Sequence, residues 1–122
     1  MDRIFFTIGA WLGALGVAAG AFVAHFLQGR LAPERLHVFS TGVWYHLIHA
    51  LALLIVAWAT TRWPRTATTL AGWLFVVGTV LFSGSLYLLG LTGIQGFGYV
   101  TPLGGVAFIA GWLALAWAVW EG

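Results

Sequence analysis

The chain has 122 residues, of which 61% are hydrophobic and 7% are charged, and its formal net charge is +2. A water-soluble protein usually has about 25% charged residues, so this composition excludes an ordinary soluble globule and predicts an integral membrane protein with the lipid bilayer as its partner. The arginines are scattered along the chain, which argues against a nucleic-acid partner. The chain contains no cysteine, which excludes disulfides and thiolate chemistry.

Four apolar stretches are long enough to cross a membrane, since a spanning helix needs about 20 mainly apolar residues. We expect spans at residues 4–26, 42–61, 70–89 and 102–120. The connections are short, so the predicted fold is one all-α domain, residues 1–122, forming a compact four-helix transmembrane bundle. Ala19-Gly20-Ala21 could be a signal-peptide cleavage site, but the apolar run continues to Phe26, which favours a retained first helix.

The second helix is predicted to begin near Pro33, because proline suits the first turn of a helix and Glu34 lies near the positive end of its dipole. A helix from there to Thr61 measures about 43 Å, longer than a hydrocarbon core of about 30 Å. We therefore expect its first turns to project into the interface, or the helix to bend at Gly42. Thr101 before Pro102 is a similar start signal for the fourth helix, with the threonine as N-cap.

The arginines also predict an orientation. With four spans, one side of the membrane carries three arginines and the other carries two, at positions 3, 62 and 65 and at positions 30 and 35 respectively. The positive-inside rule then favours both termini in the cytoplasm. Near the arginine-rich side we expect an interfacial belt of tryptophans, formed by Trp58, Trp63, Trp117 and Trp120.

Glycines form a stripe along the first helix. Gly9, Gly13, Gly16 and Gly20 follow one another at intervals of four, three and four residues. In lipid, such small residues let a second helix approach closely. The stripe predicts packing within the bundle, with homo-oligomerisation as the alternative.

All four histidines lie between positions 25 and 49. From helix rise and the expected span ends, His25 and His49 fall near the depth of Ser83, Ser85 and Tyr87 in the third span. An unpaired polar group in hydrocarbon costs a few kcal/mol, so we expect these five side chains to form an inward-facing polar layer near the extracytoplasmic face. The layer has two interpretations: hydrogen bonding between helices, or binding of a metal, cofactor, proton or lipid headgroup.

The chemistry available to such a layer is limited. His25, His46 and His49 are the set that could supply three metal ligands, but no carboxylate lies at that depth, so we expect no metal and no cofactor. The acids are Asp2, Glu34 and Glu121. None lies within a span to orient a histidine beside a serine, so we expect no enzyme. The glycine-rich segment 90–99 lacks lysine and arginine and is predicted to be a tight turn in the interface rather than a phosphate cradle.

Several motifs carry a resemblance along nearly the whole chain. They are Gly20-Ala-Phe-Val-Ala-His25, Pro33-Glu-Arg-Leu36, Thr41-Gly-Val-Trp-Tyr45, His49-Ala-Leu-Ala-Leu53, Phe82-Ser-Gly-Ser-Leu-Tyr87, Thr101-Pro-Leu-Gly-Gly-Val-Ala-Phe108 and Gly111-Trp112. In this order the chain resembles the YgdD/YwdK-like small bacterial inner-membrane proteins of unknown function (domain of unknown function 423), which have small eukaryotic transmembrane relatives. The resemblance implies four transmembrane helices and a bacterial inner-membrane location, with no established activity.

The family's histidine positions align with His25 and His49, and its Ser-Leu-Tyr aligns with Ser85 to Tyr87. His46 departs from the pattern, which often has other residues there, and this weakens the three-histidine metal site. Trp44 also departs, because a more polar residue is expected at its position.

Two functional hypotheses follow. The first is a non-enzymatic membrane protein that serves as a binding, assembly or accessory partner of a lipid, another membrane protein or a second copy. The alternative is a small transporter, channel or proton-linked device with His25 and His49 in its path, acting as a single chain or as a homo-oligomer.

Overall fold

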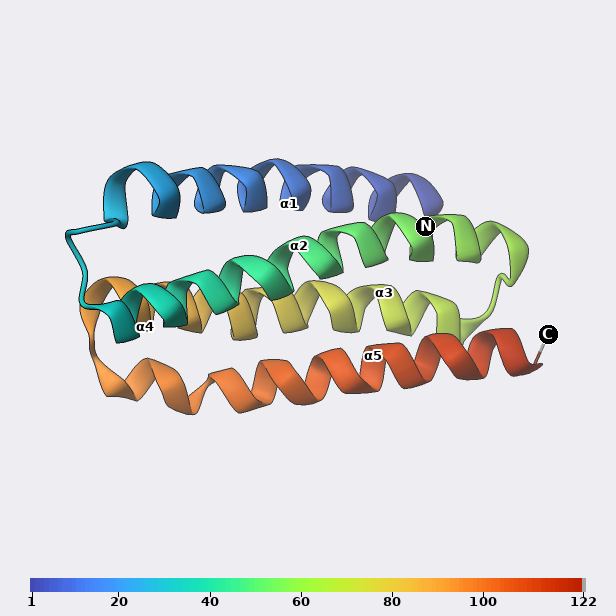
Figure 1. Ribbon diagram of the computed structural model, residues 1–122. Helices are drawn as coiled ribbons and strands as arrows, with labels where there is room; N and C mark the ends of the chain where they lie inside the picture. The colour runs from blue at the N-terminus through green and yellow to red at the C-terminus, as the bar shows by residue number, and fades with distance from the viewer. Residues whose placement is uncertain (122) are drawn as a thin grey trace.

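Helices make up the structure, which is a computed structural model describing residues 1–121, and four spans run back and forth along one axis (Figure 1). The first span comprises α1 (Asp2–Phe22) and the π-helical turn η1 (Val23–Leu27), and the second is α2 (Pro33–Arg62). The third comprises α3 (Thr66–Gly78), the π-helical turn η2 (Thr79–Ser83) and α4 (Gly84–Thr92). The 3-10 turn η3 (Gln95–Tyr99) leads into α5 (Thr101–Glu121), the fourth. Each span contains the range predicted from the sequence, so the all-α membrane fold is confirmed.

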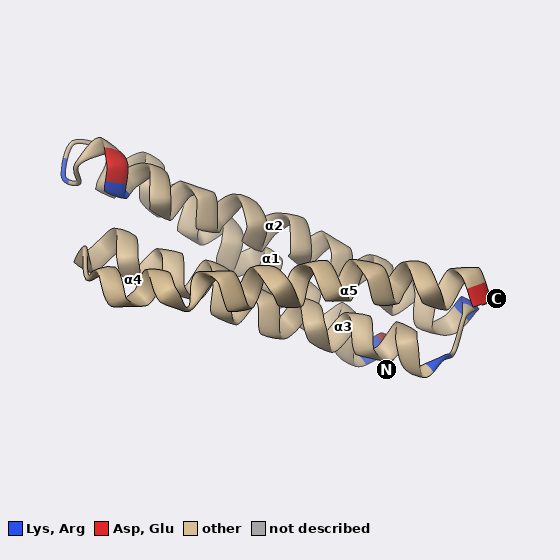
Figure 2. Cartoon of the chain, turned by 90° about the horizontal axis from the view of Figure 1, so that it is seen from below, with Lys and Arg blue, Asp and Glu red and all other residues tan. Residues whose placement is uncertain are grey.

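The charged residues lie at the two ends of the bundle, with an uncharged belt between them (Figure 2). We call the end that holds the start of α1, the 63–65 connection and the last turn of α5 the terminal end. The opposite end holds the connection between η1 and α2 and the connection between α4 and α5. A membrane accommodates this pattern, because charges are costly in hydrocarbon and favourable in the interfaces.

The ends of the helices follow local chemistry. Pro33 is the first residue of α2, as predicted, and the helix continues without interruption to Arg62. Over 30 residues it measures about 45 Å, so its first turns extend beyond a hydrocarbon core, and no break occurs at Gly42. At the other connection, Gly93 ends α4 in the left-handed conformation at a φ of 72°, which glycine adopts without a steric penalty. The segment 90–99 is therefore partly helical on both sides of this residue, rather than one tight turn.

The second span occupies the centre of the bundle. α1 packs along one side of α2, and the third span packs along another side, while α5 packs mainly against the third span. Buried side chains from all four spans form the main apolar core, which comprises Phe5, Ala52, Leu53, Val56, Ala57, Phe75 and Phe108. α1 is thus the most peripheral helix. Besides packing on α2, it contacts α3 through Phe5, whose ring lies against Trp73 and Gly72.

Most of the glycine stripe on α1 faces α2. A Cβ added at Gly9 would lie 2.9 Å from the backbone oxygen of Ala50, and one at Gly16 would lie 2.5 Å from the side chain of Leu47. Gly20 lies at ordinary contact distance from Val43. Gly13 differs, because a Cβ there would meet nothing within 4 Å. The predicted close packing within the bundle therefore holds for three of the four glycines, and the inclusion of Gly13 is wrong because position 13 lies at the edge of the face that meets α2.

We expect Gly9→Ala to destabilise the protein and Gly13→Ala to leave it as stable or slightly more stable. The added methyl group at position 9 must displace backbone of α2, and overpacking costs about 1–3 kcal/mol. The same change at position 13 gains helix propensity in open space. Thermal unfolding of both variants in mild detergent measures the difference, and equal melting temperatures would contradict the α1–α2 packing described here.

Candidate functional site

His49 lies in the middle of α2, with 3% of its surface exposed, and both of its ring nitrogens are hydrogen-bonded. Nδ1 lies 2.8 Å from the backbone oxygen of Tyr45, which can only accept, so this nitrogen carries the hydrogen. Trp112 of α5 donates its indole N–H to Nε2 at 3.1 Å, so Nε2 carries none. The ring is therefore neutral and fully paired, and it stacks on Phe108 with ring centroids 3.6 Å apart.

His46, one turn earlier on α2, is buried beside α1 and α4. Its Nδ1 lies 2.7 Å from the hydroxyl oxygen of Tyr87 in α4. Its Nε2 is buried and has no hydrogen-bond partner among the described residues. The absence of a side chain at Gly16 makes room for this ring, since a Cβ there would lie 3.3 Å from the His46 Cδ2 atom.

Ser83 and Ser85 connect the third span to different neighbours. Ser83 closes the π-helical turn η2 and donates its hydroxyl hydrogen to the backbone oxygen of Gly42 at 2.7 Å. Ser85 lies 2.6 Å from the hydroxyl of Thr101, at the start of α5. Residues two apart on a helix point in nearly opposite directions, so the pair holds α4 between α2 and α5. Thr101 is the first residue of α5 rather than its predicted N-cap, because its hydroxyl bonds to Ser85 of the third span.

Tertiary structure brings four of the five predicted polar residues into the bundle. His49, Ser83 and Ser85 are buried, and Tyr87 is half-buried with its hydroxyl on His46. They form separate pairs between helices rather than one connected layer: Ser83 and Tyr87 bond to α2, whereas His49 and Ser85 bond to α5.

His25 is exposed, so the prediction that it faces inward is wrong. It lies in the π-helical turn η1, the last helical turn before the connection to α2, where its neighbours Ala24 and Phe26 are exposed as well. His25 therefore does not join His49 inside the bundle.

The sequence-based reasoning missed three partners, His46, Trp112 and Thr101. His46 was predicted only as a member of the possible three-histidine metal set and not of the polar layer. Trp112 belongs to the Gly111-Trp112 motif, but its partner could not be predicted because it depends on how α5 is rotated against α2. Among residues 1–121 no three His, Asp or Glu side chains are arranged to hold a metal ion.

Arg35 ties the opposite end together. Its Nε donates to the backbone oxygen of Gly90 at 2.9 Å, and its Nη2 donates to the backbone oxygen of Leu91. These oxygens lie in the last turn of α4, where helix carbonyls lack intrahelical partners and carry partial negative charge. The Pro33-Glu-Arg-Leu36 motif thereby joins the start of α2 to the end of the third span.

Comparison with known proteins identifies the family. A family model described as "Protein of unknown function (DUF423)" matches residues 19–105. The chain belongs to this DUF423 family. Its matched region includes Arg35 and all of the paired polar residues except Trp112, but it begins after the first three glycines of α1.

Similar proteins carry the name UPF0382 membrane protein. YwdK of Bacillus subtilis is 46% identical over 93% of this chain and 93% of its own length. A protein of Staphylococcus aureus, SAB0533, is 40% identical over 98% of this chain and 97% of its own. One of Haemophilus influenzae is 37% identical over 96% and 94%. No solved structure matches the chain. This DUF423 protein is therefore a membrane protein of a family whose function is unknown.

We expect His49→Ala to destabilise the bundle strongly and His25→Ala to have little effect. The first change empties a buried, stacked position and leaves the Trp112 donor without a partner, which corresponds to a loss of about 2–5 kcal/mol. The second removes an exposed side chain, which corresponds to about 0.5 kcal/mol or less. Unfolding of both variants in the same detergent provides the test, and comparable losses would show that His25 is packed inside.

Proposed function

We propose that this protein is a non-enzymatic membrane component that acts by assembling with other membrane proteins, in the first place with a second copy of itself. The observation that carries the proposal is an imbalance between the two faces of α1. One face packs on α2, whereas the other presents small residues and has no neighbouring helix among residues 1–121.

The polar interior supports a role that involves no chemistry. His49 uses both ring nitrogens within the bundle, and Ser83 and Ser85 are bonded to neighbouring helices. The three acids lie at the ends of the bundle (Figure 2). Side chains paired in this way stabilise helix packing, and among the described residues the Nε2 atom of His46 is the buried polar side-chain atom left without a partner.

The outer face of α1 has the pattern that associates helices in lipid. Exposed alanines at positions 10, 14, 18 and 21 are four, four and three residues apart, so they lie along one face. Close approach of two such faces replaces the hydrophobic driving force that is absent in a bilayer. Inside the protein, Gly9 and Gly16 make the same kind of contact with α2.

We infer a second copy as the partner because the same face carries both a projecting ring, that of Trp11, and a notch that this ring lines together with Ala10 and Ala14. Ala10 and Ala14 line a notch of about 270 Å³, and beside it Trp11 projects with 68% of its surface exposed. In a two-fold arrangement each surface meets the same surface of the partner. The Trp11 ring of one copy would then enter the notch of the other.

We expect Ala14→Cys to form a disulfide-linked dimer when membranes containing it are treated with an oxidant. The chain has no cysteine of its own, so any crosslink reports on the introduced one. Ala116→Cys is the matched control, because it is an exposed alanine on α5, outside the proposed interface. Crosslinking at position 14 no greater than at position 116 would overturn the proposed dimer.

We also propose a bacterial inner-membrane location with both termini in the cytoplasm. Three arginines at the terminal end against two at the opposite end support this orientation. Of those two, Arg35 is bonded to helix carbonyls. We expect Gln28→Cys to react with a membrane-impermeant maleimide in intact spheroplasts, and Pro64→Cys to react after lysis. Both residues are exposed, at opposite ends of the bundle. The reverse labelling pattern would contradict the orientation.

A further inference from the structure

The terminal end carries a groove that continues from the interface into the apolar zone. Its outer part, about 560 Å³, is lined mainly by polar residues: Met1, Asp2, Thr60, Thr61, Pro64, Arg65, Thr66 and Thr69. Its inner part, about 380 Å³, lies between α1 and α2 and reaches Phe6, Leu54 and Trp58. Asp2 and Thr61 line both parts, so the two adjoin each other.

From these features we propose that the groove binds one anionic diacyl phospholipid, with its phosphate where the two parts meet, beside Asp2 and Thr61, and an acyl chain along the inner part. From Thr61 to Leu54 the inner wall extends about 10 Å along α2, which takes a lipid from its headgroup to the upper part of its acyl chain. The exposed rings of Phe6 and Trp58 supply the apolar contact.

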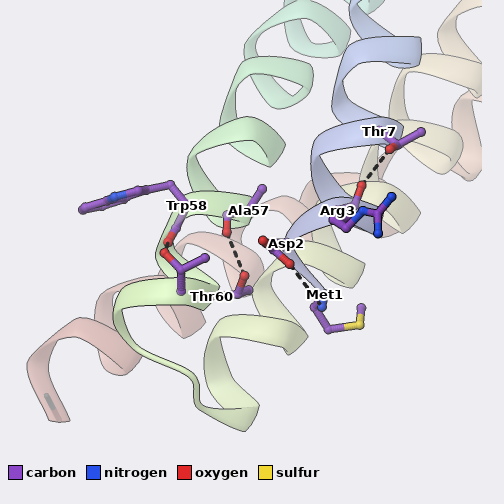
Figure 3. A network of polar contacts seen from close by, with 8 residues as sticks. Met1, Asp2, Arg3, Thr7, Ala57, Trp58 and Thr60 are labelled. Atoms are coloured by element: carbon purple, nitrogen blue, oxygen red, sulfur yellow. Dashed lines mark hydrogen bonds and ion pairs between the residues drawn. The ribbon is translucent and has the colours of Figure 1, made fainter.

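The charges of the groove favour an anion. Arg65 lines its outer part and Arg3 its inner part, and neither arginine is paired with an acid among residues 1–121. Asp2 is the one acid in the lining, and its carboxylate lies 3.9 Å from the Met1 amino group (Figure 3). Two guanidinium groups against one carboxylate leave a positive site, and the carboxylate can accept a hydrogen bond from a headgroup hydroxyl.

The donors available to a phosphate can be identified. Thr7, Thr60 and Thr61 donate their hydroxyl hydrogens to backbone oxygens of their own helices, as Figure 3 shows for Thr7 and Thr60. These threonines therefore line the groove without offering hydrogens to a ligand. The outer lining still offers the hydroxyls of Thr66 and Thr69. The guanidinium groups of Arg3 and Arg65 are the charge-assisted donors of the lining, and such bonds to phosphate are the strong ones.

The site is separate from the proposed dimer contact. On α1 the groove is lined by residues up to Thr7, whereas the notch is lined by Ala10, Trp11 and Ala14, so the two share no residue. Lipid binding and crosslinking at Ala14 are therefore measured independently, and the failure of one leaves the other to be tested by its own experiment.

The test measures binding of dioleoyl-phosphatidylglycerol and dioleoyl-phosphatidylcholine to the purified full chain by native mass spectrometry. Each basic residue near an anionic lipid contributes on the order of fivefold in affinity, so we expect about a 20-fold preference for phosphatidylglycerol. The Arg3→Gln, Arg65→Gln double variant should lose this preference. Arg30→Gln, which removes an exposed arginine at the opposite end, should retain it.

A second variant tests the place of the lipid without changing charge. Thr61 is exposed and lines both parts of the groove, so Thr61→Trp should block the groove and weaken phosphatidylglycerol binding severalfold while the melting temperature is unchanged. Equal binding of both lipids, or equal losses in the double variant and Arg30→Gln, would overturn the proposal. Displacement of the lipid by millimolar inorganic phosphate would also overturn it, because the site would then be one for a free anion.

Discussion

In hydrocarbon, every buried polar group needs a partner inside the protein, and the arrangement of the spans depends on how α2 meets this requirement. Its residues bond in two directions across the bundle: the Gly42 oxygen accepts from Ser83, while His49 accepts from Trp112 of α5. The His49 bond crosses from α2 to a helix that packs mainly on the third span. These bonds specify how the helices are rotated about their axes, which apolar packing alone leaves weakly defined.

Close backbone approach is the second element of the design, and it depends on where side chains are missing. Gly9 and Gly16 bring α1 onto α2, and Gly42 leaves room for the ring of Tyr87, which approaches within 2.9 Å of a Cβ placed there. Helices that approach this closely gain dispersion contacts, which replace the hydrophobic drive absent in lipid. The polar pairs can form because these contacts bring their helices within hydrogen-bonding distance.

The four spans are packed to unequal extents, and this leaves exposed the two surfaces for which we propose functions. α2 is enclosed by neighbours, whereas α1 packs along one helix and leaves its other face open. A helix held on one side alone presents an outer face to the membrane and a groove beside its neighbour. The proposed dimer contact and the proposed lipid site both arise from this peripheral position of α1, one at mid-helix and one at the terminal end.

Composition and hydropathy were sufficient to predict the fold class, the four spans and the start of α2 at Pro33, because a bilayer demands long apolar helices and places charges at their ends. Depth along a span also follows from helix rise, which is why Ser83, Ser85 and His49 were correctly expected to be buried. The rotation of each helix about its own axis could not be predicted from the sequence. In the structure, His25 and Gly13 lie away from the interior, whereas Trp112 contacts His49. The face that a helix turns inward depends on neighbouring helices, and these lie far away in the sequence.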